Sequence, residues 1–138
     1  LVMPQPLRQS ELIGLLTNKY SLAAAQQLNI LVVDDDLLAR QFLATLLRQS
    51  GYNVLAASDG EQAISCVISQ TVDLIFMDIH MPHMNGLEAI QELRTTYGLK
   101  LPIIALTAHL LNSERTATIA AGANDILIKP LNMAPGDS

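Results

Sequence analysis

The sequence predicts an open, doubly wound α/β fold built on a parallel sheet of five strands, and two observations support this. Short apolar runs with no polar face, such as 28–33 and 74–77, are typical of strands that are buried on both sides. These runs alternate along the chain with segments whose apolar residues recur at helical spacing. Strands that alternate with helices form parallel sheets, so we expect helices on both faces of one central sheet.

The predicted elements follow one another from residue 28 onward. Gly51 suits the end of the first helix, Asp59 is placed to cap the second, and Gly122 follows the fourth. Strands are expected at 28–33, 52–56, 74–77, 101–106 and 125–128, and helices at 37–49, 59–69, 86–97 and 113–121. This alternation is that of the flavodoxin-like fold, whose strand order 2-1-3-4-5 places the topological switch point between the first and third strands.

Composition and charge exclude several classes of function. The 138 residues suffice for one domain with its own core, and 50% of them are hydrophobic. A net charge of −5 argues against a nucleic-acid-binding surface, which needs basic groups to displace counterions. No apolar run approaches the ~20 residues of a membrane span, and the single cysteine, Cys66, cannot form a disulfide within the chain. We therefore expect a cytoplasmic location without direct membrane contact.

Charged and polar side chains stand at the ends of four predicted strands. Asp34 and Asp35 follow the first strand, and Asp78 closes the third. Thr107 follows the fourth strand and Lys129 follows the fifth. The carboxyl ends of parallel strands meet at one edge of a sheet, and a carboxylate buried there needs a cationic partner. The sequence therefore predicts a site that combines carboxylates, one ammonium group and one hydroxyl group.

These motifs resemble those of the receiver (response-regulator) domains of two-component phosphorelay systems. The resemblance covers about 28–131, and the motifs occur in the order and spacing of that family. They are Val32-Val33-Asp34-Asp35, Met77-Asp78-Ile79-His80-Met81-Pro82, Asn85-Gly86, Leu106-Thr107-Ala108, Ala121-Gly122-Ala123 and Lys129-Pro130-Leu131. Each motif alone is weakly specific, whereas the ordered set is highly specific.

A magnesium ion is the predicted cofactor of this site. Crowded carboxylates repel one another, and a hard divalent cation that prefers oxygen ligands relieves the repulsion. Asp35 and Asp78 are expected as direct ligands, and Asp34 as a ligand that binds directly or through water. The resemblance implies a further ligand in the backbone carbonyl of His80, without its imidazole. Asp36 is expected to face solvent or to cap the following helix.

Asp78 is the expected phosphoacceptor. Phosphoryl transfer needs an oxygen nucleophile and cations around the phosphoryl oxygens, and an ionised carboxylate needs no general base. Mg²⁺ and Lys129 meet the charge requirement, while the hydroxyl of Thr107 and the backbone N–H of Ala108 are expected to donate hydrogen bonds. The resemblance implies that a histidine kinase or a histidine phosphotransfer domain is the partner that supplies the phosphoryl group.

Several alternatives remain for the function of the whole protein. The expected parent is a hybrid sensor histidine kinase, with this domain in the cytoplasmic part of a membrane-bound sensor; a stand-alone response regulator is the alternative. A phosphatase of the haloacid dehalogenase type would show Asp-X-Asp, whereas His80 occupies the second position here. An inactive receiver-like scaffold would lack an acid, the acceptor or the lysine, and all are present.

The chain departs from the family pattern at two places. Ile126 stands three residues before the lysine, where the family usually carries Tyr or Phe. An aliphatic side chain has no ring that could rotate on activation, so the resemblance does not extend to the family's usual activation switch. A receiver domain should also end with a helix, but Pro135-Gly136 opposes a helix of any length. The last helix is therefore expected to be truncated, which would leave part of one sheet face uncovered.

The first 27 residues lie outside the receiver pattern of 28–138. Residues 10–16 carry apolar side chains at helical spacing and predict a short amphipathic helix. Gln5-Pro6-Leu7 matches Lys129-Pro130-Leu131 in two of three positions, so this segment resembles the tail of an upstream degenerate receiver; a chance match is the alternative. We predict that the helix covers the open sheet face, within the chain or by exchange in a dimer. Its expected buried residues are Leu12, Ile13, Leu15 and Leu16.

Overall fold

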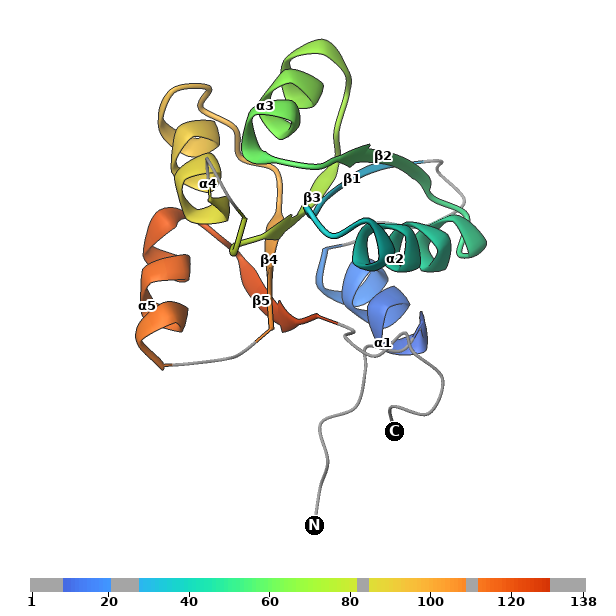
Figure 1. The fold of residues 1–138 in the computed structure, drawn as a ribbon. Helices are drawn as coiled ribbons and strands as arrows, with labels where there is room; N and C mark the ends of the chain where they lie inside the picture. Colours follow the sequence, from blue (N-terminus) through green and yellow to red (C-terminus); the bar gives the residue numbers. More distant parts are fainter. Residues whose placement is uncertain (1–8, 21–27, 82–84, 109–111, 130–138) are drawn as a thin grey trace.

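A computed structural model of the 138-residue chain describes residues 9–20, 28–81, 85–108 and 112–129. Helices cover both faces of a central sheet (Figure 1). The strands are β1 (Asn29–Val33), β2 (Asn53–Ala57), β3 (Leu74–Asp78), β4 (Ile103–Thr107) and β5 (Asp125–Ile128). The helices are α1 (Gln9–Gly14), its π-helical continuation η1 (Leu15–Lys19), α2 (Leu37–Gln49), α3 (Gly60–Ser69), α4 (Gly86–Thr95) and α5 (Asn112–Ala121). Within these described ranges, no helix has the length and apolar character that crossing a membrane requires.

The sheet has the predicted topology. Its five strands are parallel and lie in the order β2-β1-β3-β4-β5. Val33 at the end of β1 pairs with Met77 of β3, and Asp78 at the end of β3 pairs with Leu106 of β4. The carboxyl ends of the three central strands therefore meet at one edge, where an open α/β sheet places its ligands.

Two boundaries differ from the predicted ones by a few residues. The strand expected at 101–106 begins at Ile103, directly after Pro102, which has no N–H to give to a neighbouring strand. The helix expected at 86–97 ends at Thr95, and Gly98 then reverses the chain with a φ of 64°. The apolar pattern marks the buried part of each element and says less about its ends.

The apolar side chains of the strands divide between two core clusters, one on each face of the sheet. Successive residues of a strand point to opposite faces, so Val32 and Val33 belong to different clusters. One cluster packs under α3, α4 and α5 and includes Leu31, Val33, Ala63, Ile75, Met77, Ile90, Leu93 and Ala105. The other packs under α1, η1 and α2 and includes Leu12, Leu16, Ile30, Val32, Leu43, Leu47, Phe76, Ile104 and Leu106.

The side chain of Arg94 joins α4 to the turns around β4 and β5. Its guanidinium donates hydrogen bonds to the carbonyls of Leu99 and Leu101, at 2.8 and 2.7 Å, and to that of Gly122 at 3.0 Å. It also donates to Oδ1 of Asn124 at 2.8 Å. A Cβ at position 122 would lie 2.7 Å from Cγ of Arg94, and φ is 123° there, so both geometry and space favour glycine.

The amphipathic N-terminal helix packs against the sheet within the same chain. Leu12 and Leu16 are fully buried in the cluster that also contains Ile30, Val32 and Phe76. Ile13 and Leu15 are only partly buried against the same cluster, so the prediction that all four would be buried was too broad. Figure 1 shows α1 beside α2 on the side of the sheet opposite α3 and α4. The expected truncation of the last helix concerns residues 130–138, which lie outside the described ranges.

We expect Leu12→Ala to lower the free energy of unfolding by about 2–5 kcal/mol, because it removes fully buried methyl groups from the cluster beneath the sheet. Leu38→Ala provides a matched control, since Leu38 is 63% exposed, and should change the free energy by less than ~1 kcal/mol. Urea denaturation of the two variants measures the difference. Equal effects would show that α1 does not form part of the core.

Candidate functional site

The predicted carboxylates and lysine come together at the carboxyl edge of the sheet. Asp34 directly follows β1 and Asp78 ends β3, and both are only 1% exposed. Lys129 directly follows β5, where its backbone N–H donates to the carbonyl of Thr107 at 2.8 Å and so extends the pairing of β5 with β4. The order of the strands thus brings residues from three distant parts of the sequence into one site.

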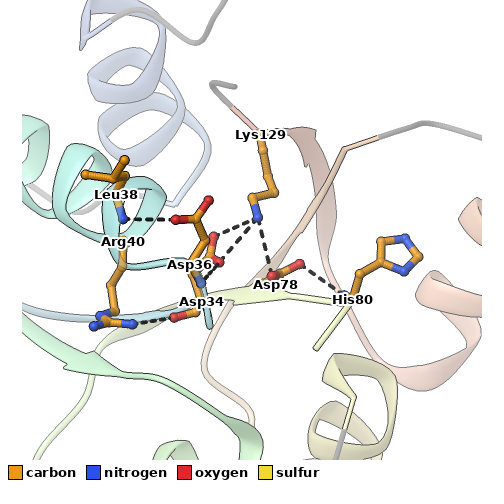
Figure 2. A network of polar contacts seen from close by, with 7 residues as sticks. All are labelled: Asp34, Asp36, Leu38, Arg40, Asp78, His80 and Lys129. Carbon is orange, nitrogen blue, oxygen red and sulfur yellow. Dashed lines mark hydrogen bonds and ion pairs between the residues drawn. The ribbon is translucent and has the colours of Figure 1, made fainter. Parts of the chain in front are cut away.

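The ammonium group of Lys129 lies between the two buried carboxylates (Figure 2). Its Nζ is 3.0 Å from Oδ2 and 3.3 Å from Oδ1 of Asp34, and 3.4 Å from Oδ2 of Asp78. The side chain of Lys129 is 12% exposed, so water screens these contacts little. The cationic partner that the strand-end carboxylates require is therefore present, and it is closer to Asp34 than to Asp78.

Backbone contacts fix the acidic run after β1. Oδ1 of Asp34 accepts a hydrogen bond from the N–H of Asp36 at 2.9 Å, and Nη1 of Arg40 donates to the Asp34 carbonyl at 2.7 Å. Asp36 is exposed, and its side chain accepts from the N–H of Leu38 at 3.0 Å and caps α2, which confirms both of its expected roles. Asp35 is exposed beside the site. The run therefore divides into a buried acid, an exposed acid and a helix cap.

His80 contacts Asp78 through its backbone rather than through its ring. Its N–H donates to Oδ1 of Asp78 at 3.0 Å, and Figure 2 shows the imidazole directed away from the carboxylates. Nε2 of that imidazole lies 3.2 Å from Oε2 of Glu114 on α5. The carbonyl of His80 stays a predicted ligand. The partner Glu114 was not predicted, because nothing in the sequence links residues 34 positions apart on a loop and a helix.

The Asn85-Gly86 motif places the start of α4 directly against the end of β3. Asn85 accepts a hydrogen bond from the N–H of Glu88 at 2.9 Å, and Glu88 accepts from the N–H of Asn85 at 3.2 Å, so the two form a capping box. A Cβ at Gly86 would lie 2.2 Å from the carbonyl oxygen of Asp78 and 2.6 Å from Cα of Ile79. Only glycine allows this approach of the two backbones.

Thr107 and Ala108 end the neighbouring strand at the same edge. Thr107 is 1% exposed and pairs with Ile128, directly before the lysine, while Ala108 is half-buried. Thr107 follows Leu106, the register partner of Asp78, so it lies one position beyond the carboxylate on the adjacent strand. Their donation to a phosphoryl group stays a prediction.

The surroundings of Asp78 favour its protonated form when no cation is bound. Burial raises the pKa of Asp78 from 3.8 to about 7. The N–H of His80 and the ammonium of Lys129 lower this pKa, whereas the charge of Asp34 and a hydrogen bond that the protonated Asp78 carboxyl donates to Asp34 raise it. For Lys129, burial lowers the pKa, but the hydrogen bonds and charges of Asp34 and Asp78 outweigh burial and raise it overall. The site thus holds more negative charge than one lysine comfortably balances.

The carboxylate cluster fits a hard divalent cation. Oxygen atoms of Asp34, Asp35 and Asp78 lie within 4.8 Å of one another, and two of these three acids are buried. Carboxylate oxygens without nitrogen or sulfur donors are the ligands that Mg²⁺ prefers. Within the described part of the chain, no other group of at least three His, Cys, Asp or Glu side chains comes together in this way. A cation here would relieve the charge imbalance that raises the pKa of Asp78.

Fold and site together define a doubly wound α/β protein with an acidic, lysine-containing centre at its switch point. The family model described as the response regulator receiver domain matches residues 30–135, most of the chain. The protein belongs to the response regulator receiver domain family.

Curated relatives extend this similarity. The chain is 46% identical over 101 residues to the response regulator MprA of Mycolicibacterium vanbaalenii, covering 73% of this chain and 43% of that protein. It is 43% identical over 103 residues to the transcriptional regulatory protein CpxR of Klebsiella pneumoniae, covering 75% of this chain and 43% of that protein. The chain thus spans less than half the length of these relatives.

Solved structures show the same fold. The chemotaxis protein CheY4 of Vibrio cholerae superimposes with a TM-score of 0.73 and 33% identity over 77% of this chain and 89% of that one. The receiver domain of the histidine kinase CKI1 from Arabidopsis thaliana, solved with Mg²⁺, gives a TM-score of 0.67 and 34% identity over 75% and 84% of the two chains.

We expect Gly86→Ala to destabilise the fold by about 1–3 kcal/mol, because the new methyl group would overlap the backbone of Asp78 and Ile79. Gly14→Ala is the matched control. Position 14 is helical, and a Cβ there would meet only the side chain of Asn18 at 3.8 Å, so alanine should be neutral or stabilising by up to ~1 kcal/mol. Thermal or urea denaturation decides; similar effects at both glycines would contradict the close approach.

We also expect Asp78→Asn to raise the free energy of unfolding, by an amount that depends on pH, in the absence of divalent cations. A raised carboxyl pKa means that the folded state holds the proton more tightly, so stability falls as pH rises from about 4 to about 7 and then levels off. The asparagine removes this titration. The variant should therefore gain stability over the wild type across that range, by an amount on the order of 2–4 kcal/mol. A difference that is the same at pH 4.5 and pH 8 would contradict the raised pKa.

Proposed function

We propose that this domain accepts a phosphoryl group on Asp78 from a phosphohistidine, as one step of a Mg²⁺-dependent phosphorelay. The observation that carries this proposal is the buried Asp78 carboxylate at the switch point, facing the ammonium of Lys129 and accompanied by Asp34 and Asp35. Such a centre combines a nucleophilic oxygen with cationic charge on one side. Membership of the receiver domain family supports the same reading.

The transfer exchanges one bond to phosphorus for another. A carboxylate oxygen of Asp78 attacks the phosphorus atom in line with the phosphohistidine nitrogen, a phosphorus–oxygen bond forms, and the phosphorus–nitrogen bond breaks. The electron pair of the broken bond stays on the imidazole, which takes up a proton. The acceptor needs no base, because only its ionised form attacks.

The residues around Asp78 would stabilise the charge on the transferred group. Lys129 lies 3.4 Å from the acceptor carboxylate and would form an ion pair with one phosphoryl oxygen. The hydroxyl of Thr107 and the N–H of Ala108 would donate hydrogen bonds to the other phosphoryl oxygens. Mg²⁺, held by Asp34, Asp35, Asp78 and the carbonyl of His80, would supply the remaining positive charge. The CKI1 receiver domain, which was solved with Mg²⁺ and also with Mg²⁺ and BeF₃⁻, supports this assignment by its similarity to the chain.

The donor would be a histidine kinase or a histidine phosphotransfer domain, and the reaction would take place in the cytoplasm. No role in nucleic-acid binding is proposed for this segment, in line with its net charge of −5. MprA and CpxR are regulators roughly twice as long as the matched region, so an output function would depend on parts of a protein beyond this chain.

The architecture of the parent protein is a separate proposal. The CKI1 receiver domain belongs to a histidine kinase and supports the expected hybrid sensor kinase. The curated relatives MprA and CpxR are regulators and support a stand-alone response regulator instead. The upstream degenerate receiver, of which residues 1–27 would be the tail, also stays a proposal. The full-length coding sequence distinguishes these architectures directly.

We expect Asp78→Asn to abolish phosphorylation while the fold is retained, because the amide keeps the volume of the side chain without its anionic nucleophile. The measurement is transfer of ³²P from a phosphorylated histidine phosphotransfer domain or from labelled acetyl phosphate, with Mg²⁺ or with EDTA. The wild type should be labelled with Mg²⁺ and lose most of its labelling rate in EDTA.

Asp59→Asn is the matched control for this experiment. Asp59 caps α3 through a hydrogen bond from the N–H of Gln62, and asparagine caps helices equally well. This variant should label at the wild-type rate. Labelling of Asp78→Asn at that rate would refute the acceptor, steady turnover of a phosphate ester would indicate a phosphatase, and no labelling of the wild type would indicate a scaffold.

A further inference from the structure

The segment that precedes the receiver domain makes polar contacts with β5, the strand that leads directly to Lys129. The hydroxyl of Tyr20 donates a hydrogen bond to Oδ2 of Asp125, and Nζ of Lys19 lies 2.7 Å from the same oxygen. Asp125 is the first residue of β5. Two neighbouring side chains from outside the matched family region thus converge on one carboxylate at the start of this strand.

The two contacts differ in their exposure to solvent. The side chain of Lys19 is 55% exposed, so solvent weakens its ion pair. Tyr20 is half-buried, and burial together with the hydrogen bond to Asp125 holds the pKa of its hydroxyl well above the usual range. Burial raises the pKa of Asp125, but the hydrogen bonds from Lys19 and Tyr20 outweigh burial and lower it overall. The segment is therefore tied to Asp125 by two contacts, of which the tyrosine hydroxyl is the better shielded from solvent.

The apolar side of residues 9–20 packs against the face of β5 that carries Asp125. Leu127 packs against the cluster that contains Leu12 and Leu16, whereas Ile126 packs against the cluster on the opposite face. Side chains two residues apart in a strand share a face, so Asp125 and Leu127 project toward α1 and η1. The backbone pairing of β5 with β4 continues to the N–H of Lys129. Lys129 is two residues beyond Leu127, so it continues the row formed by Asp125 and Leu127.

A short distance separates this anchor from the phosphoacceptor site. Four residues of strand from Asp125 to Lys129 span roughly 13 Å at about 3.3 Å per residue. Among the described residues, the far edge of β5 has no partner strand, because β5 is the last strand of the order β2-β1-β3-β4-β5. The lateral position of this edge strand therefore depends on β4 on one side and on the packing of helices above and below.

We infer that residues 9–20 act as a positioning element for Lys129, and that the contacts of Tyr20 and Lys19 with Asp125 set the rate of phosphoryl transfer to Asp78. This inference rests on the proposed phosphoacceptor function. Tyr20 and Lys19 touch no reacting group and act through β5. An upstream part of a longer protein that pulls on this segment would thereby alter the reactivity of the site.

The test compares the double variant Lys19→Met/Tyr20→Phe with the wild type in the full 138-residue chain. Both substitutions keep the apolar part of the side chain and remove the contact with Asp125. Phosphorylation by acetyl phosphate at saturating Mg²⁺ should become about two- to tenfold slower, the range expected from loss of one or two net hydrogen bonds. The backbone amide resonance of Lys129 in the unphosphorylated protein should shift.

Three controls separate positioning from general stability. Thr17→Val removes a hydrogen bond from Oγ1 to the carbonyl of Ile13 within the same segment, without touching β5, and should keep the wild-type rate. Leu46→Ala weakens the same core cluster from α2 and should lower stability but leave the rate unchanged. Lys19→Arg with Tyr20 intact should retain the wild-type rate, because the cation and the hydroxyl remain.

The outcomes distinguish this inference from the proposed function. A double variant that reacts at the wild-type rate with an unmoved Lys129 amide overturns the positioning role while the phosphoacceptor stands. A rate that falls equally in Leu46→Ala also overturns it, since stability alone would then explain the loss. If the wild type itself is not labelled, the phosphoacceptor function fails, and the Lys129 amide alone decides whether the segment positions the lysine.

Discussion

The ammonium group of Lys129 between Asp34 and Asp78 is the interaction on which the rest of this structure depends. Two carboxylates that are almost completely buried would repel each other at the end of adjacent strands. One lysine cannot neutralise both, and burial together with the charge of Asp34 keeps the pKa of Asp78 raised, to about 7. The site is therefore kept short of positive charge, which is the condition under which a cation binds strongly and an acyl phosphate can be stabilised.

Two sets of contacts fix the positions of Asp34 and Asp78, one at the loop after β1 and one at the end of β3. Arg40 and Asp36 hold the loop after β1 through its backbone, and the approach of Gly86 holds the end of β3. Oδ1 of each acid accepts one backbone hydrogen bond, from the N–H of Asp36 at Asp34 and from the N–H of His80 at Asp78, while Oδ2 of each acid faces Lys129. The polypeptide thus fixes where the acids lie and leaves the remaining oxygens available for a cation.

The sheet and the centre of the site could be predicted from the sequence because both follow from local patterns. Runs such as 74–77 are entirely apolar, so their composition alone predicts that they are buried. The carboxyl ends of parallel strands bring Asp34, Asp78 and Lys129 to one edge of the sheet, whatever the conformation of the loops. The ends of elements were less predictable, as at Pro102, because local hydrogen bonding decides them. Contacts between distant surface groups, such as Glu114 with His80, left no sequence signal at all.

The packing of the N-terminal helix could be predicted from the sequence only in part. Its amphipathic pattern predicted a buried face, and Leu12 and Leu16 are indeed fully buried. The pattern could not predict that Tyr20 and Lys19 would meet Asp125, because that contact depends on the angle at which the helix leaves the sheet. Ile13 and Leu15, next in sequence to the two buried leucines, are only partly buried against the same cluster.

The burial of Leu12 and Leu16 bears on what counts as one module in this protein. The family match begins at Ile30, a residue that lies in the same apolar cluster as both leucines. A recombinant fragment cut at the family boundary would lack Leu12 and Leu16, and so remove part of the cover that the described residues give to Ile30, Val32 and Phe76, although α2 still packs on the same cluster. We therefore expect fragments for expression, exchange or fusion to be more stable when they start before residue 9 than when they start at Ile30.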